Sequence, residues 1–129
     1  MRYLLSADIL LIHSLLIEKT GGGRGVRDAH AILALETLPS QTSFGQELYP
    51  EITMKAAVYA RNIIMSHPFV DGNKRTGMTC AIVFLEDNGF VFQAQEGDIE
   101  TFAVSIVTEH LELEDISHWF ALRTKRKSI

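Results

Sequence analysis

Cysteine, proline and long apolar runs are scarce in this sequence, and each shortage excludes a class of protein. The 129 residues include one cysteine, so no disulfide can form within the chain, and we expect a reducing, cytoplasmic location. Three prolines and nine glycines are too few for a collagen-like or low-complexity chain. Apolar stretches such as residues 9–12 and 80–85 are too short to span a membrane, and we expect no signal peptide.

The sequence also has no excess of basic residues, since 12 Lys and Arg stand against 16 Asp and Glu. The net charge of −4 argues against a general nucleic-acid-binding protein, and we interpret the basic end, Lys125 to Lys127, as a solvated tail. Hydrophobic residues make up 47% and charged residues 22% of the chain, as in an ordinary folded protein. The length suits a single domain over residues 1–129.

Apolar residues recur at helical spacing along most of the chain. We predict about six helices, over residues 6–20, 28–36, 51–66, 73–88, from 98 onward and about 113–124, with N-caps at Ser6, Asp28, Asn73 and Asp98. Residues 73–88 are apolar on most sides, so this helix should be the buried centre of a compact all-α bundle. We expect a short extended segment at 90–94 and an exposed loop or weak β-hairpin at 41–50.

Residues 67–76, with the sequence HPFVDGNKRT, concentrate reactive side chains between two predicted helices. The free N–H groups at the start of the second helix favour an anion such as phosphate. Lys74 and Arg75 lie in its first turn, where cations disfavour the helix unless a phosphate is bound. Gly72 would let a ligand approach the backbone closely.

Two further side chains of this segment suggest group-transfer chemistry. Asp71 supplies a hard oxygen ligand that could hold Mg²⁺ together with phosphate oxygens. His67 is of the type that can accept a proton from an attacking hydroxyl near neutral pH. A base, a metal ligand and a phosphate cradle suit in-line transfer of a phosphoryl or nucleotidyl group. A zinc site is the weaker interpretation, because His67 and Asp71 have no evident third protein ligand.

Other features have structural interpretations. We interpret the glycine run at 21–25 as a helix stop, because it lacks the Lys-Ser/Thr that follows a phosphate-binding loop. His13 and His30 lie on amphipathic helices as surface or satisfied core groups. Phe69 should anchor the loop by pointing into the core, and Cys80 should pack there as a small apolar residue.

The segment resembles the signature of the Fic/Doc (Fido) family, His-x-Phe-x-Asp/Glu-Gly-Asn-Gly/Lys-Arg. The matching residues are His67, Phe69, Asp71, Gly72, Asn73, Lys74 and Arg75. Residues 25–28, 44–50 and 84–89 are also similar to the death-on-curing branch of the family, the toxins of type II toxin–antitoxin pairs.

The resemblance implies an ATP- and Mg²⁺-dependent transferase acting on a hydroxyl of a cytosolic protein, with a translation factor as the suggested target. It implies that His67 is the general base, that Asp71 holds Mg²⁺, and that Gly72, Asn73, Lys74 and Arg75 bind the nucleotide phosphates. It also implies a flap at residues 41–50 that aligns the target segment. Ser14 to Glu18 has the spacing of a family inhibitory helix, but we interpret this as coincidence and expect a separate antitoxin over the nucleotide groove.

Two departures from the AMP-transferring pattern favour transfer of the terminal phosphoryl group. Lys74 stands where those members have glycine, and its long side chain would change how the triphosphate sits. Met78 stands where they usually have a second arginine. The alternatives are an AMP or nucleotidyl transferase and, in a different class, an inactive module that keeps the fold and binds a partner.

Overall fold

The computed structural model describes residues 1–128, and Ile129 of the expected domain lies outside the described residues. Six α-helices dominate the described part and confirm the all-α class. They are α1 (Ser6–Thr20), α2 (Ala29–Ala34), α3 (Ile52–Ser66), α4 (Asn73–Asp87), α5 (Asp98–Thr108) and α6 (Leu113–Ala121), with a 3₁₀ turn η1 (Leu38–Ser40). Within these residues, none of the helices has the length and apolar character needed to cross a membrane.

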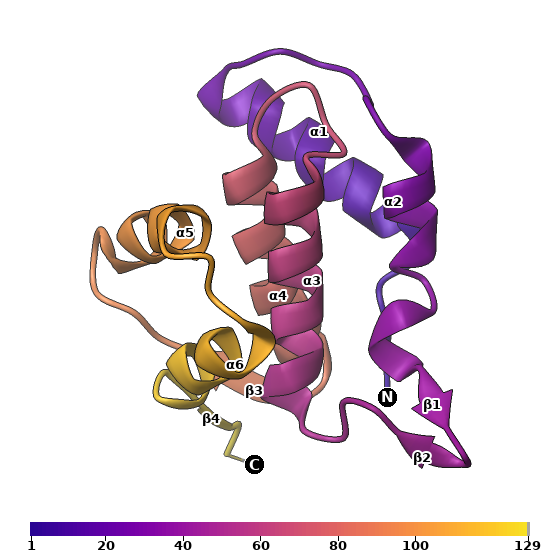
Figure 1. Ribbon diagram of the computed structural model, residues 1–129. Helices are drawn as coiled ribbons and strands as arrows, with labels where there is room; N and C mark the ends of the chain where they lie inside the picture. Colours follow the sequence, from indigo (N-terminus) through magenta and orange to yellow (C-terminus); the bar gives the residue numbers. More distant parts are fainter. Residues whose placement is uncertain (129) are drawn as a thin grey trace.

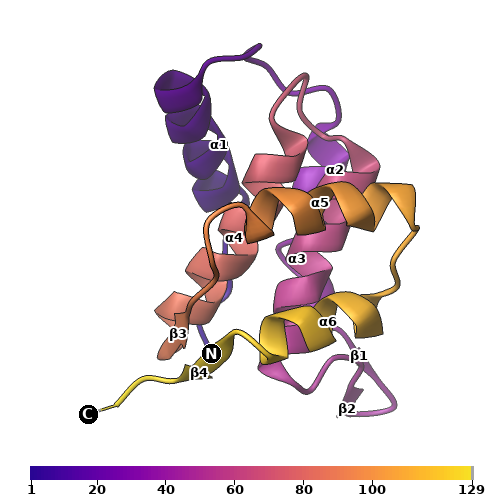
Figure 2. The same cartoon turned by 90° about the vertical axis from the view of Figure 1, so that its left-hand side faces the viewer.

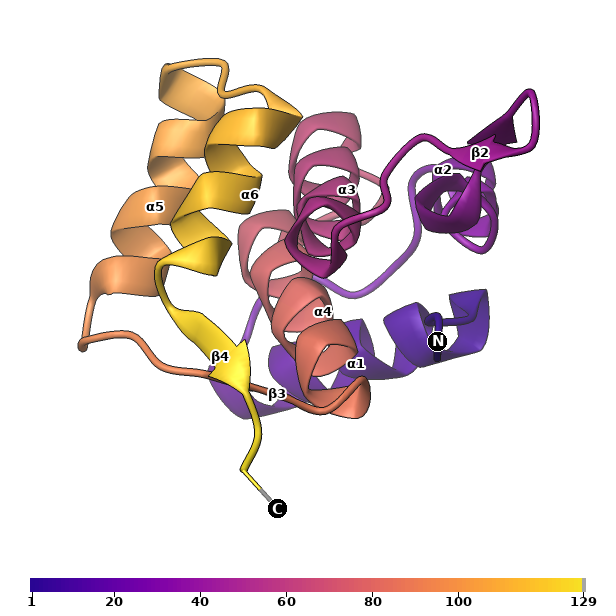
Figure 3. The same ribbon diagram turned by 90° about the horizontal axis from the view of Figure 1, so that it is seen from below.

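The core is a pair of antiparallel helices, α3 and α4, rather than α4 alone (Figure 1). Helices α5 and α6 cover one side of the pair, and α1 and α2 cover the other (Figures 2 and 3). The pair is buried because both helices present apolar side chains over most of their surface. The fully buried members include Tyr59, Ile63, Ile64, Cys80, Ala81, Phe84 and Leu85. Burial raises the pKa of the Cys80 thiol, so it packs as an apolar group.

Gly77 sets the close approach of α3 and α4. A Cβ atom at this position would lie 2.8 Å from Cγ1 of Ile64 and 3.0 Å from the carbonyl oxygen of Ala60. The second of these atoms is helix backbone and cannot move aside. The pair can therefore pack at this distance only with glycine at position 77.

We predict that Gly77→Ala lowers the free energy of unfolding by about 1–3 kcal/mol, the usual cost of an overpacked core. In an uncrowded helix the same change would stabilise the protein by up to about 1 kcal/mol, because alanine is the better helix former. Urea unfolding measures whether the free energy of unfolding falls or rises. A more stable variant would contradict the close packing of α3 and α4 at Gly77.

Helix ends differ from the prediction at three of the four expected N-caps. Asp28 caps α2 as predicted, accepting a hydrogen bond from the Ala31 N–H. In α1, α4 and α5, however, the N-caps are Leu5, Gly72 and Gly97, and the predicted residue is the first of the helix. Gly89 has the predicted left-handed conformation after α4, with φ of 89°.

The end of the chain was also predicted incorrectly. Helix α6 ends at Ala121, and β4 (Thr124–Arg126) pairs antiparallel with β3 (Phe90–Phe92). The residues expected to be the end of the last helix and a basic tail are therefore partly strand. The pairing closes the bottom of the bundle beside the end of α4 (Figure 3).

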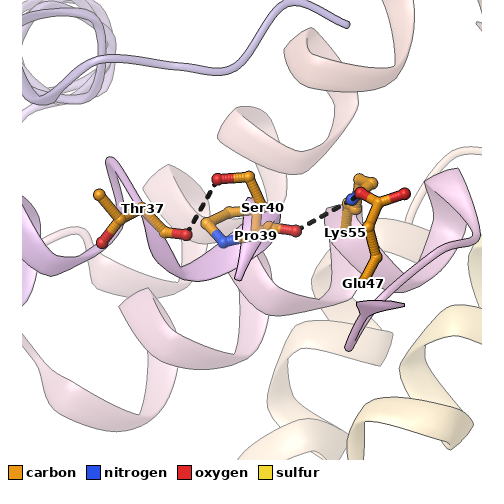
Figure 4. A network of polar contacts seen from close by, with 5 residues as sticks. All are labelled: Thr37, Pro39, Ser40, Glu47 and Lys55. Atoms are coloured by element: carbon orange, nitrogen blue, oxygen red, sulfur yellow. Dashed lines mark hydrogen bonds and ion pairs between the residues drawn. The ribbon is translucent and has the colours of Figure 1, made fainter. Parts of the chain in front are cut away.

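A short hairpin, β1 (Thr42–Ser43) with β2 (Gln46–Glu47), confirms the weak hairpin expected at residues 41–50. The buried amine of Lys55 fastens it to α3, donating to Oε1 of Glu47 at 2.6 Å and to the carbonyl of Pro39 at 3.0 Å (Figure 4). Burial disfavours the charge of Lys55, but the hydrogen bond to Glu47 and the nearby Tyr3 outweigh it, so the pKa of Lys55 lies above its usual value.

Candidate active site

The loop that joins α3 to α4 carries the signature residues and is held from both sides. It begins at His67, which ends α3 in the left-handed conformation with φ of 51°. Phe69 points into the core, as predicted, and is 1% exposed. Arg27 holds the end of α3, because its guanidinium donates to the carbonyl oxygens of Ser66 and His67 at 2.7 and 2.8 Å.

The imidazole of His67 is exposed at the head of this loop. Its Nδ1 lies 3.2 Å from the carbonyl oxygen of Met65. A carbonyl oxygen can only accept a hydrogen bond, so this contact assigns the proton of the neutral ring to Nδ1. Nε2 is then left with its lone pair free, as a general base requires.

Asn73 braces the loop from within rather than capping the helix with its side chain. Its Oδ1 accepts from the Phe69 N–H at 3.0 Å, and its Nδ2 donates to the Phe69 carbonyl at 2.9 Å. The side chain is 8% exposed and uses both ends of its amide in this way. The backbone N–H of Asn73, at the first position of α4, is the group that it can offer to a phosphate without breaking this bracing.

Asp71 presents an exposed carboxylate that two backbone amides hold in place. Its Oδ2 accepts from the Gly23 N–H at 3.1 Å, and its Oδ1 accepts from the Gly72 N–H at 2.8 Å. The hydrogen bond from Gly23, followed by that from Gly72, lowers the pKa of Asp71 below its usual value. The group is therefore ionised at neutral pH, which is the form that binds a metal ion.

The glycine run does more than stop α1, which is the role that the sequence predicted for it. Gly22 has φ of 123°, and a Cβ atom there would lie 2.8 Å from Oδ2 of Asp71. Gly23 supplies one of the two hydrogen bonds to the same carboxylate. Gly22 and Gly23 therefore line the site next to Asp71. The sequence carries no signal for this role, because a glycine run in a loop does not show which distant residue it contacts.

We predict that Gly22→Ala displaces the Asp71 carboxylate and lowers activity about tenfold or more, as loss of support around a metal ligand usually does. Gly21→Ala is the matched control, because Gly21 also has a positive φ, of 82°, but nothing lies within 4 Å of its added Cβ. Both variants carry the backbone cost of alanine at positive φ, and only the first meets Asp71. Equal activities of the two variants would contradict the steric argument.

The start of α4 has the properties of an anion site. The first N–H groups of a helix have no partner within it, and among the described residues no side chain caps this end. Lys74 is exposed there. The Arg75 guanidinium reaches the end of α1, where it donates to Oγ1 of Thr20 and, at 3.5 Å, to the carbonyl of Gly21.

A groove of about 390 Å³ opens beside these two cations, between α1, α4 and α5. Its volume lies in the range of small-molecule sites. Apolar side chains form most of it, and its charged lining residues are Lys74, Arg75 and Glu100. The lining residues are Leu16, Lys74, Arg75, Met78, Thr79, Ile82, Ile99, Glu100, Ala103 and Val104.

The hairpin at 41–50 does not border this site, so the predicted flap position was wrong. The hairpin precedes the start of α3, whereas His67 follows its end. The 15 residues of α3 separate them by about 22 Å at 1.5 Å per residue (Figure 1). The segment that does run beside the loop is the one after α1, where Val26 forms an antiparallel β-bridge with Phe69.

Metal ligands are few around the loop. Residues 1–128 contain no group of three or more His, Cys, Asp and Glu side chains placed to hold one ion. Asp71 can therefore bind a metal only together with ligand or water oxygens. Mg²⁺ is usually bound in this way, through one or two carboxylates and substrate phosphates, so the residues present fit this ion.

The fold and the loop together define a protein of the Fic type. A sequence model described as the Fic/DOC family matches residues 3–85, and the chain belongs to this family. The chain is also similar to a protein named Toxin Doc from Mycolicibacterium smegmatis. The two are 33% identical over 118 residues, which span 89% of this chain and 88% of the relative.

Proposed function

We propose that this protein is a toxin-type transferase that moves the terminal phosphoryl group of ATP to a hydroxyl of a target protein. The observation that carries the proposal is the loop between α3 and α4. There an imidazole with a free Nε2 and an ionised carboxylate stand before an uncapped helix N-terminus. The family and the similarity to a Doc toxin support the same reaction class.

The proposed roles follow from the chemistry of each group. His67 accepts the hydroxyl proton at Nε2 while the hydroxyl oxygen bonds to the γ-phosphorus. The bond from that phosphorus to the bridging oxygen breaks, and ADP leaves. The amides at the start of α4, with Lys74 and Arg75, offset the phosphate charge. Asp71 would hold Mg²⁺, which would help to neutralise the charge of the phosphates.

The groove between α1, α4 and α5 is the proposed place of the nucleoside. Its apolar walls suit a base, and Glu100 can accept hydrogen bonds from ribose hydroxyls or an amino group. A cognate antitoxin would inhibit the enzyme by laying a segment over this groove. The site of action would be the cytoplasm, and a translation factor is the class of target that we propose.

Labelled ATP tests the proposal directly. The protein is incubated with Mg²⁺ and cytosolic proteins, in one reaction with γ-labelled and in another with α-labelled ATP. We expect label on protein from the γ position only. Label from the α position only would show AMP transfer, the second candidate, and would overturn the proposal.

Expression in cells tests the candidate of a different class, the inactive binding module. Growth arrest that persists after loss of His67 would favour that module over an enzyme.

A further inference from the structure

His13 of α1 contacts the catalytic loop at two points. It is 5% exposed, and its ring stacks on Phe69 with centroids 3.8 Å apart and planes 5° from parallel. Its Nε2 lies 2.8 Å from the carbonyl oxygen of Asp71. Because a carbonyl oxygen only accepts, Nε2 must carry a proton and donate.

The second contact reaches the Asp71 carboxylate through a rigid unit. The carbonyl of Asp71 and the N–H of Gly72 belong to one planar peptide group. His13 binds the oxygen of that plane, while the N–H on its other side donates to Oδ1 of Asp71. Fixing the oxygen thereby fixes the direction of the donor that holds the carboxylate.

The first contact fixes the middle of the loop. Phe69 lies two residues after His67 and two residues before Asp71, and its backbone is already bound at both polar groups by Asn73. The ring of His13 covers the Phe69 side chain in the core. The loop is thus clamped between α1 and the start of α4, at a point between its two reactive side chains.

From this geometry we propose that His13 is a positioning residue of the active site, which orients the Asp71–Gly72 peptide and through it the metal-binding carboxylate. Its effect on catalysis rests on the proposed function. Its effect on the carboxylate does not, and can be measured without any turnover. The amides of Gly23 and Gly72 report this directly, because both donate to Asp71.

Two variants separate the hydrogen bond from the stacking. His13→Phe keeps a ring to stack on Phe69 and removes the donor. His13→Gln removes the ring and keeps an N–H donor the same number of bonds from Cβ as the histidine Nε2. We expect His13→Phe to lose about tenfold or more in kcat with little change in thermal stability, the usual cost of removing a group that supports a metal ligand. His13→Gln should keep most of kcat and lose stability.

Hydrogen exchange of the Gly23 and Gly72 amides reports their bonds to Asp71 directly. If His13 only packed in the core, the exchange of these two amides would not depend on its hydrogen bond. We expect protection of Gly23 and Gly72 to fall roughly tenfold in His13→Phe and to return in His13→Gln, while amides of α6 stay unchanged. Wild-type protection in His13→Phe, or equal losses in both variants, would overturn the proposal. Should His13→Phe fail to fold, loss of protection in folded His13→Gln would overturn it. Absence of transfer by the wild type would refute the proposed function and leave the exchange result to decide the positioning role.

Discussion

Replacing His67 with asparagine is expected to abolish protein phosphorylation, with a loss of about 10²–10⁴-fold for removal of a general base. The fold should survive, because the imidazole is exposed and its hydrogen bond is to the backbone carbonyl of Met65, two residues away. Asparagine suits the position because the backbone there has φ of 51°, a conformation that asparagine adopts more readily than most residues. Transfer of labelled γ-phosphate at saturating ATP measures the effect.

The matched variant for this prediction is His67→Ala. It removes the same base but places alanine in the left-handed conformation, so it should be equally inactive and somewhat less stable. Melting temperatures of the two variants separate the chemical loss from the structural one. Activity of either variant within threefold of wild type would exclude His67 as the base, because the described loop offers no second imidazole.

The helices could be predicted because their signal is local. Apolar spacing identified α1, α3, α4 and α5 to within a few residues. The caps were harder, and Asn73 shows why. The sequence rule places asparagine at an N-cap, but burial of Phe69 leaves the N–H and carbonyl of that residue in need of partners. Asn73 meets this need, so Gly72 turns the chain instead.

The features that the sequence could not show depend on contacts between distant residues. Thr124 to Arg126 form a strand only because Phe90 to Phe92 lie beside them. The hairpin at 41–50 was expected near His67, but Lys55 fastens it to the opposite end of α3. The strand and the position of the hairpin both depend on contacts with distant residues, which local periodicity and propensity do not report.

In the candidate site, the reactive residues could be predicted from the sequence, whereas several residues that support them could not. The motif at 67–75 supplied every residue to which we assign a reactive role, because those residues are adjacent in the sequence. Three of the groups that support them, however, come from segments 40 to 58 residues earlier in the chain. Arg27 binds the end of α3, Gly23 binds Asp71, and His13 binds the peptide after it. No spacing rule links such groups to the motif.

The second large effect is expected at Asp71. Asp71→Asn should lower phosphoryl transfer about 10²-fold or more, in the range found when one charge-stabilising group is removed from an active site. The remaining activity should need more Mg²⁺, because the amide is a weaker ligand than the carboxylate. Asp87→Asn is the matched control, since it removes the same charge from an exposed position at the end of α4. Titration of activity with Mg²⁺ compares the two.

The same variant makes a prediction about stability and pH. The amides of Gly23 and Gly72 lower the pKa of Asp71 in the folded state, so the ionised carboxylate stabilises the fold. That contribution is fully present above the pKa of the unfolded chain, about 3.9, and is lost as the pH falls through the lower folded value. Wild type should therefore be more stable than Asp71→Asn at pH 7, and urea unfolding should show the difference shrinking toward pH 3. A difference that stays constant with pH would mean that the two amides do not hold the charged carboxylate.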